Sequence, residues 1–462
     1  MQKESFHKED ISTFMDTNKD LMTEGSIKNK IIVFAIPIFL GNLFQQLYNA
    51  VDSVIVGNYI GSNALAAVSS AGNLIFMIIG FFNGIAIGAG VIIARYIGAK
   101  DQKRISLAVH STVALGIFFS IVLTAVGVLM TPFILNLMST PKDVLSDSIV
   151  YFQVYFAGST GFVMYNTFVG ILQATGDSKH PLYYLMLSSI VNIVLDLVLI
   201  GKMGFGVGAA AFATAISQLF SAILCIIHLT KTEEAYKFRW KLIKFDKEIT
   251  SQIIKYGLPS GLQNSIMSFS NVVIQSYINS YGHFAMAGIG AYVKIEGFIF
   301  IPVTSFTMAI TTFVSQNIGA KQIERVRKGI RFGLLCTLLS AELLGLVLFS
   351  FAPIFISFFD TNKAVIEYGS QRAHIVCLFF FLCAYTHFMS AVLRGIGRPM
   401  VPMFVFLFCW CVVRIIFLAI INVFVHTIYS TYWIYPITWI LSAVTLTIYY
   451  KNLKLEEAIY KI

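Results

Sequence analysis

Long apolar runs, separated by short polar segments, make up most of the chain. A hydrocarbon core about 30 Å thick is crossed by roughly 20 helical residues, and each run is long enough for that. The pattern therefore predicts an all-α integral membrane protein with twelve transmembrane helices, near residues 31–57, 65–94, 108–136, 149–173, 181–201, 207–229, 253–280, 284–315, 330–358, 365–392, 400–425 and 429–450.

The second half of this pattern repeats the first. Ile97-Gly98-Ala99-Lys100 recurs as Ile318-Gly319-Ala320-Lys321. The same offset along the chain relates Pro132 to Pro353, Gly176 to Gly397 and Pro181 to Pro402. Each half holds six expected helices, so the halves run parallel, as two repeats related by a pseudo-two-fold axis along the membrane normal. In the paired loops, the glycine is expected to end one helix in a left-handed conformation and the proline to open the next.

The repeat divides the chain into two lobes with polar ends. The expected parts are a cytoplasmic tail at 1–30, an N-lobe at 31–229, a cytoplasmic linker at 230–252, a C-lobe at 253–450 and a cytoplasmic tail at 451–462.

Composition and charge support this class and set the orientation. Hydrophobic residues make up 57% of the chain and charged residues 12%, which excludes an ordinary soluble protein. With both termini in the cytoplasm, 27 of the 33 basic residues fall on the cytoplasmic side and three, Lys142, Lys202 and Lys363, on the outside. The net charge of +10 therefore reflects orientation in a cell membrane and does not indicate nucleic-acid binding. We expect a monomer surrounded by lipid.

Signatures of catalysis and of nucleotide binding are missing from the sequence. It contains no GxxxxGK[ST] phosphate loop, no HExxH pair and no GxSxG elbow. The interpretation is that the protein is not an enzyme and uses no cofactor.

Two aspartates stand inside predicted spans of the first half, where a charge is expensive and therefore indicates function. At ~1.5 Å rise per residue, Asp52 lies about 13 Å and Asp196 about 9 Å below the outer surface. Thr214 lies at about 10 Å on the same scale. Asn192 precedes Asp196 by one helical turn and shares its helix face. Two buried carboxylates that face each other bind a proton more readily than exposed ones, and oxygen ligands also suit sodium.

The chain resembles the multidrug and toxic compound extrusion (MATE) family over nearly its whole length, and within that family the bacterial branch with N-lobe cation coupling. The resemblance rests on PIFLGNLFQQLYNAVDSVIVG at 37–57, ALAAV at 64–68, ARYIGAK at 94–100, LQATGDSKHP at 172–181 and LRGIGRPMVP at 393–402. It implies that Asp52, Asn192, Asp196 and Thr214 shape a cation-coupling site, with Asp52 and Asp196 as metal ligands if sodium is the coupling ion.

The resemblance also implies a substrate cleft between the lobes, lined by the first, second, seventh and eighth spans. The candidates there are Phe44, Gln45, Tyr48, Met77, Met267, Tyr277, Glu296 and Phe298. Some relatives carry a cation site in the C-lobe, but here the tenth span carries Arg372 where an aspartate is expected. We therefore expect Glu296 and Glu342 to pair with Lys294, Arg372 or Arg414, with contact between Glu296 and a cationic substrate as the alternative.

These observations favour a secondary active efflux transporter that exchanges cytoplasmic organic cations or drugs for protons or sodium by alternating access. The alternative is a flippase of lipid or lipid-linked oligosaccharide, which would need several basic residues along the cleft. A passive channel is disfavoured because no filter-like segment is visible in the sequence.

Overall fold

The computed structural model describes residues 21–137, 142–425 and 427–456, and within residues 62–79 it describes few side chains. Over these ranges the chain is helical and contains no strand. The helices form twelve membrane-scale segments, six in each half, and the number of predicted helices is confirmed.

The first half contains seven α-helices in six segments. They are α2 (Ile27–Tyr59), α3 (Ser62–Gly98), α4 (Gln102–Leu137), α5 (Lys142–Ala157), α6 (Ser159–Thr175), α7 (Lys179–Asp196), which continues as a π-helical turn over Leu197–Lys202, and α8 (Gly208–Lys231). The fourth expected span, 149–173, is thus divided between α5 and α6 at Gly158.

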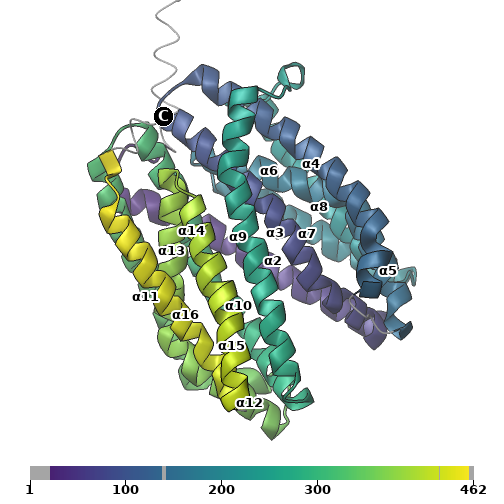
Figure 1. The fold of residues 1–462 in the computed structure, drawn as a ribbon. Helices are drawn as coiled ribbons and strands as arrows, with labels where there is room; N and C mark the ends of the chain where they lie inside the picture. Colours follow the sequence, from purple (N-terminus) through teal and green to yellow (C-terminus); the bar gives the residue numbers. More distant parts are fainter. Residues whose placement is uncertain (1–20, 138–141, 426, 457–462) are drawn as a thin grey trace, which may run out of the picture.

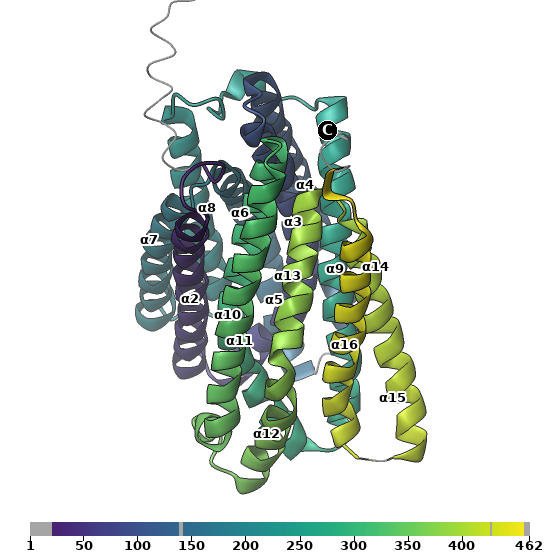
Figure 2. The ribbon, with the colours of Figure 1, turned by 90° about the vertical axis from the view of Figure 1, so that its left-hand side faces the viewer.

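The second half begins after a short 3-10 turn at Trp240–Leu242. Its helices are α9 (Lys247–Asn279), α10 (His283–Gly319), α11 (Ile323–Ser357), α12 (Lys363–Val376), α13 (Phe380–Ile396), α14 (Met400–Phe406), α15 (Val413–Phe424) and α16 (Tyr429–Asn452). A 3-10 turn joins α12 to α13, which lie end to end, and a π-helical turn joins α14 to α15 (Figure 2).

The outer surface of the bundle is apolar. Ten helical segments among the described residues are long and apolar enough to cross a membrane. Large apolar side chains such as Leu129, Phe358 and Phe424 are 75–77% exposed. Because lipid tails solvate such side chains and water does not, this surface is the one expected against the hydrocarbon core.

The internal repeat is present in the backbone. Lys100 and Lys321 both adopt the left-handed conformation, with φ of 57° and 59°, after α3 and α10. Gly176 and Gly397 do the same after α6 and α13, with φ of 100° and 94°. After Gly176, the N–H of Asp177 donates to Leu172 at 3.1 Å, which closes the helix end as the paired loops predict.

The two halves lie side by side, and α9 runs between the main groups of helices (Figure 1). Its first part packs closely on α3 of the other half. At Gly84 and Gly88 of α3 an added Cβ would overlap the backbone of Gly261 and Gly257 of α9. Glycines therefore bring the two halves into backbone contact.

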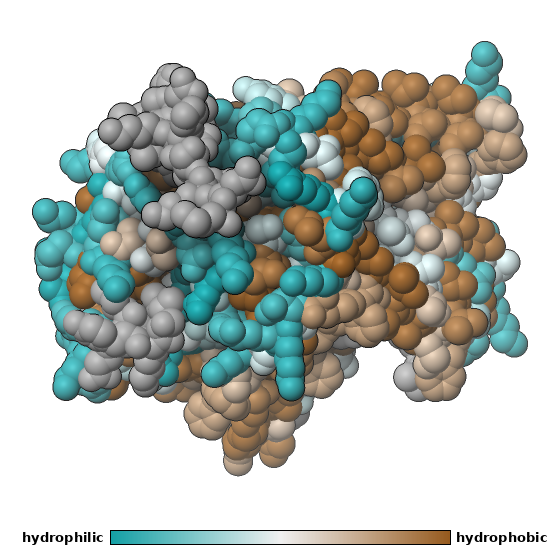
Figure 3. Space-filling view, turned by 90° about the horizontal axis from the view of Figure 1, so that it is seen from above, coloured by the Kyte–Doolittle hydropathy of each residue, from teal (hydrophilic) through white to brown (hydrophobic). Residues whose placement is uncertain are grey.

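Seen from the end that carries the C-terminus, hydrophilic side chains gather at the left and centre of the view, and hydrophobic ones cover much of the right and lower parts (Figure 3). The connection between the halves packs onto this end, where Phe238 is buried and stacks on His110. The backbone N–H groups of Arg239 and Asp246 donate to His110 and Ser111 of α4. The connection is thus bound to the first half before α9 begins.

Candidate functional site

Asp52 and Asp196 meet inside the first half. Asp52 lies in the last third of α2, and Asp196 is the last residue of α7 before the chain enters a π-helical turn. Because α2 packs along α7, the two carboxyl groups come within hydrogen-bonding reach of each other. Asp52 is 9% exposed and Asp196 is fully buried. The structure thus brings together the two aspartates that the sequence placed at similar depth.

Five polar atoms at this site are buried without a hydrogen-bond partner. They are Oδ1 of Asp52, both carboxylate oxygens of Asp196, and both Oδ1 and Nδ2 of Asn192. None of the ion pairs among the described residues includes either aspartate. Buried polar atoms are almost always paired, so these atoms stand out from the rest of the interior. Carboxylate and amide oxygens of this kind are ligands that a hard cation prefers.

Tyrosines surround the aspartates, and sequence analysis assigned no coupling role to any of them. Tyr48, one turn before Asp52 on α2, is 8% exposed, and its hydroxyl accepts a bond from Nε2 of Gln218 at 3.3 Å. Tyr151 of α5 is close enough to interact electrostatically with both aspartates. Tyr48 is thus buried close to Asp52, and the place predicted for it in the substrate cleft stays a prediction.

Thr214 donates its hydroxyl hydrogen to the carbonyl of Ala210, one turn earlier in α8, at 3.0 Å. Its side chain is half-buried. The bond is one that any helical threonine makes, so the part assigned to Thr214 at the coupling site stays a prediction.

The other cleft candidates lie in different surroundings. Phe44 and Gln45 are partly buried on α2, Met267 and Tyr277 pack against the core of the second half, and Phe298 is 38% exposed on α10. The side chain of Met77 lies outside the described residues. A pocket among the described residues lies elsewhere, between α3, α4 and α6 with Ile253 of α9, and its polar lining includes Asn83, Thr112 and Asn166. None of the predicted cleft residues lines it.

The second half buries positive charge. Arg372 is 3% exposed, lies between the rings of Tyr292 and Tyr435 at 4.8 and 4.7 Å, and reaches Glu296 at 4.0 Å. Arg414 is 1% exposed and donates Nε to Thr438 at 3.1 Å. The predicted pairing of Glu296 is therefore present, and aromatic rings hold the guanidinium groups by cation–π contact.

Glu342 has a different partner from the basic residue that was expected. Its carboxylate accepts the backbone N–H of Phe381 at 3.2 Å. Phe381 lies in the first turn of α13, where backbone N–H groups have no partner within the helix. The break between α12 and α13 supplies this donor, while Lys294 lies over the ring of Phe359 at 5.6 Å.

A symmetric pair of hydrogen bonds joins the two halves. Nη2 of Arg95 in α3 donates to the carbonyl of Gly395 in α13 at 3.1 Å. Nε2 of Gln316 in α10 donates to the carbonyl of Ala174 in α6 at 2.8 Å. The offset of the internal repeat relates Arg95 to Gln316 and Ala174 to Gly395, so each half makes the same contact on the other. We call these two bonds the interlobe latch.

The latch lies where the halves are in backbone contact. A Cβ added at Gly98 would overlap the carbonyl of Gln316, and one added at Gly319 would overlap the carbonyl of Arg95. Nη1 of Arg95 also donates to the hydroxyl of Tyr256 in α9 at 2.9 Å. The latch was not predicted from the sequence, although the offset of the repeat relates Arg95 to Gln316 and Ala174 to Gly395.

The chain is similar to known membrane transporters of one family. The sequence model of the MatE family matches residues 37–198 and 259–420 of the chain, one match in each half. Probable multidrug resistance protein YoeA of Bacillus subtilis (strain 168) is 28% identical over 390 residues, 83% of this chain and 84% of that protein. Probable multidrug resistance protein NorM of Thermotoga maritima is 28% identical over 389 residues, 83% of each chain.

Two solved structures share the fold. One is an outward-facing multidrug resistance MATE family transporter of the MOP superfamily, with a TM-score of 0.87 and 24% identity over 96% of this chain and 99% of that one. The other is a MOP superfamily transporter from Pyrococcus furiosus, described as having a binding pocket of reverse polarity that suggests a different function. Its TM-score is 0.89 at 23% identity, over 96% of this chain and 99% of that one.

Proposed function

The chain belongs to the MatE family of membrane transporters, and from that premise we propose that it is a secondary active exporter that exchanges cytoplasmic organic cations or drugs for protons or sodium ions. The observation that carries this proposal is the group of buried, unpartnered polar atoms of Asp52, Asn192 and Asp196. Two carboxylates that are held out of water without a basic partner need a bound cation to neutralise their charge.

Either coupling ion fits this site. A proton shared between Asp52 and Asp196 would make a hydrogen bond and relieve the repulsion between the carboxylates. A sodium ion would be bound by oxygens of Asp52, Asn192 and Asp196. In both cases the occupied site carries less negative charge than the empty one, and α2 and α7 pack together more favourably.

Helix α2 connects this site to the other half. Its earlier turns pack on α10, and Nδ2 of Asn42 donates to the hydroxyl of Thr304 at 3.4 Å. Pro37 lies inside α2, on the N-terminal side of Asn42. Because proline has no N–H, the helix lacks one backbone hydrogen bond at this point. A shift of α2 around Asp52 on ion binding would therefore change its contact with the second half, which is how the ion would bias the equilibrium between conformations.

In this mechanism the interlobe latch closes the path between the halves at one end of the molecule. By the distribution of basic residues, the end that carries Arg95 and Gln316 faces the cytoplasm. The conformation would then be closed to the cytoplasm, and export requires the latch to open and re-form in each cycle as the lobes rock.

Drugs are favoured as substrates because the curated relatives are named as multidrug resistance proteins. A flippase would need basic groups exposed to a lipid-linked phosphate. Arg372 and Arg414 are 3% and 1% exposed and are covered by aromatic rings. Lys294 is the one exposed basic residue of the three inside the predicted spans, whereas a flippase would need several.

Efflux from cells tests this function. Cells that express the protein are expected to accumulate less of a fluorescent lipophilic cation than control cells. Dissipating the proton and sodium gradients should remove the difference, whereas depleting ATP while the gradients are held should not, because no phosphate-binding loop is present in the sequence. Equal accumulation with and without the protein, or movement of lipid-linked sugar in its place, would contradict the proposal.

Thiol labelling tests the orientation. Single cysteines at Lys103 and Lys244, which are exposed at the latch end, should be protected from a membrane-impermeant reagent on intact cells. Cysteines at Lys142 and Lys363, which the sequence places outside, should react. Permeabilised cells serve as the control, since all four positions should then be labelled. The reverse pattern would place the latch on the outside and export could not be the working direction.

A further inference from the structure

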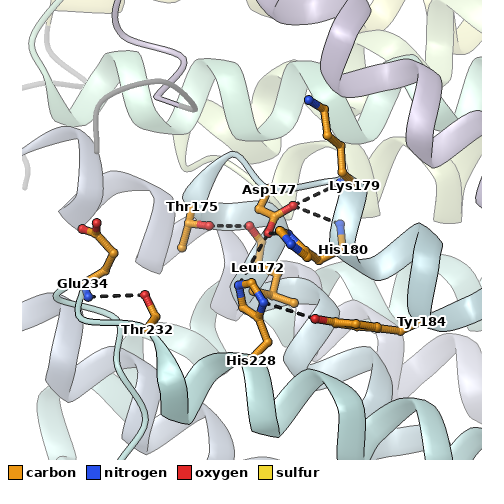
Figure 4. A network of polar contacts seen from close by, with 9 residues as sticks. All are labelled: Leu172, Thr175, Asp177, Lys179, His180, Tyr184, His228, Thr232 and Glu234. Atoms are coloured by element: carbon orange, nitrogen blue, oxygen red, sulfur yellow. Dashed lines mark hydrogen bonds and ion pairs between the residues drawn. The ribbon is translucent and has the colours of Figure 1, made fainter. Parts of the chain in front are cut away.

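Three metal-ligating side chains meet where α6, α7 and α8 come together at the latch end of the first half (Figure 4). Asp177 lies in the turn between α6 and α7, His180 in the first turn of α7 and His228 in the last turn of α8. One ligand atom from each lies within 4.8 Å of the others. The packing of α7 on α8 thus joins a local Asp–His pair to a histidine that is distant along the chain.

The two distances from Asp177 to the histidines bracket the spacing of ligands in a tetrahedral zinc site. Oδ2 of Asp177 is 2.5 Å from Nδ1 of His180 and 3.8 Å from Nε2 of His228. Zinc binds imidazole nitrogen and carboxylate oxygen at about 2.0–2.2 Å, which places tetrahedral ligands roughly 3.3 Å apart. Small side-chain rotations would therefore turn the present contacts into a coordination shell with one position left for water.

Two of the ligands are already oriented by further hydrogen bonds. Oδ1 of Asp177 accepts the backbone N–H groups of Lys179 and His180, both at 3.1 Å, which orients Oδ2 toward the two histidines. Nδ1 of His228 lies 3.1 Å from the hydroxyl of Tyr184, so Nε2 faces the cluster. A hydrogen bond on the second ring nitrogen is the usual arrangement for a histidine that binds metal.

The internal repeat shows that the fold does not require these residues. Helices α8 and α16 begin and end at equivalent positions of the two repeats, and the glycine and proline of the α6–α7 turn recur at the same offset. The positions that correspond to Asp177, His180 and His228 are occupied by Arg398, Val401 and Tyr449. The same turn and the same helix pair therefore form without a ligand set in the second half.

We propose that Asp177, His180 and His228 bind a Zn²⁺ ion at this end of the first half. The three side chains are 12%, 45% and 23% exposed, so solvent reaches the site from the side of His180. The ion would hold the α6–α7 turn against the end of α8. This proposal is independent of the transport function.

The test is a titration of the full-length, detergent-solubilised protein, without a histidine tag, with zinc. Isothermal calorimetry measures the binding. Co²⁺ absorption in the visible range reports tetrahedral coordination. The wild type should bind a single ion, and His228→Ala and Asp177→Asn should weaken binding by more than about tenfold. Tyr184→Phe, which leaves all three ligands in place, should weaken it by roughly tenfold. His283→Ala is the matched control, since His283 is exposed at the start of α10, and it should bind as the wild type does.

The proposal would be overturned if the wild type did not bind zinc, or if His228→Ala and His283→Ala bound it equally well. The cluster would then be only an Asp–His ion pair. Asp177 also caps α7, so Asp177→Asn is informative only if gel filtration and thermal unfolding match the wild type. His228→Ala removes no backbone contact and decides the question by itself.

Discussion

Asp52→Asn is expected to reduce gradient-driven efflux to the level of cells without the protein, and Asp196→Asn should do the same. Each change keeps the shape of the side chain and removes one of the two charges that a proton or a sodium ion would neutralise. Since the carboxyl groups lie within hydrogen-bonding reach of each other, an ion bound at one would also contact the other, and losing either charge weakens its binding. Asn192→Ala, which removes a neutral ligand, should weaken transport less.

Expression in the membrane and thermal unfolding in detergent must first show that both variants are folded. Glu342→Gln is the control, because Glu342 is another carboxylate inside a helix, although it is only partly buried. Its partner is the N–H of Phe381, to which glutamine can still present a carbonyl oxygen. Efflux by Glu342→Gln should therefore be close to that of the wild type. Equal loss in all three variants would indicate a general effect of removing buried charge.

Gly98→Leu should shift the equilibrium away from the conformation that is closed at the latch. A side chain at this position would overlap the carbonyl of Gln316 in the other half. Overpacking of this kind costs about 1–3 kcal/mol, which corresponds to a population shift of roughly 5- to 150-fold. The clash lies between the halves, so the packing within each half is retained. Efflux should fall because the latch can no longer re-form in each cycle.

A single cysteine at Ala174, in a cysteine-free background, measures this shift. Ala174 is 1% exposed and accepts the bond from Gln316, so N-ethylmaleimide should react with it slowly in the parent protein and faster with Gly98→Leu. Gly290→Leu is the control, because Gly290 is also a helical glycine but has open space around it. Identical labelling rates and transport in the two variants would show that the contact at Gly98 does not form a gate.

The helices and the repeat could be predicted because lipid imposes a simple rule on sequence. A membrane span needs a long apolar run, and turns such as those at Gly176 and Gly397 need a residue that tolerates a positive φ. Interruptions inside a span leave no such trace. The break at Gly158 and the turn between α12 and α13 lie within apolar runs, so the fourth and tenth spans were expected to be continuous.

Depth along a helix could be counted from the sequence, but the direction of a side chain could not. Counting placed Asp52 and Asp196 at similar depth, and the packing of α2 on α7 brings them together. The contact between Tyr48 and Gln218 of α8 could not be read from the sequence, because it depends on how α2 packs within the first half. The latch depends on how two complete halves meet, and Arg95 and Gln316 differ in chemistry although they occupy equivalent positions.

The most direct measurement is transport by purified protein in liposomes, with a pH gradient and a sodium gradient imposed separately. The wild type should move a fluorescent organic cation against its concentration when at least one of these gradients is present, and should stop when that gradient is removed. The double variant Asp52→Asn, Asp196→Asn, folded and reconstituted in equal amount, should show no gradient-driven transport. Cation-coupled transport by this double variant at the wild-type rate would contradict the account.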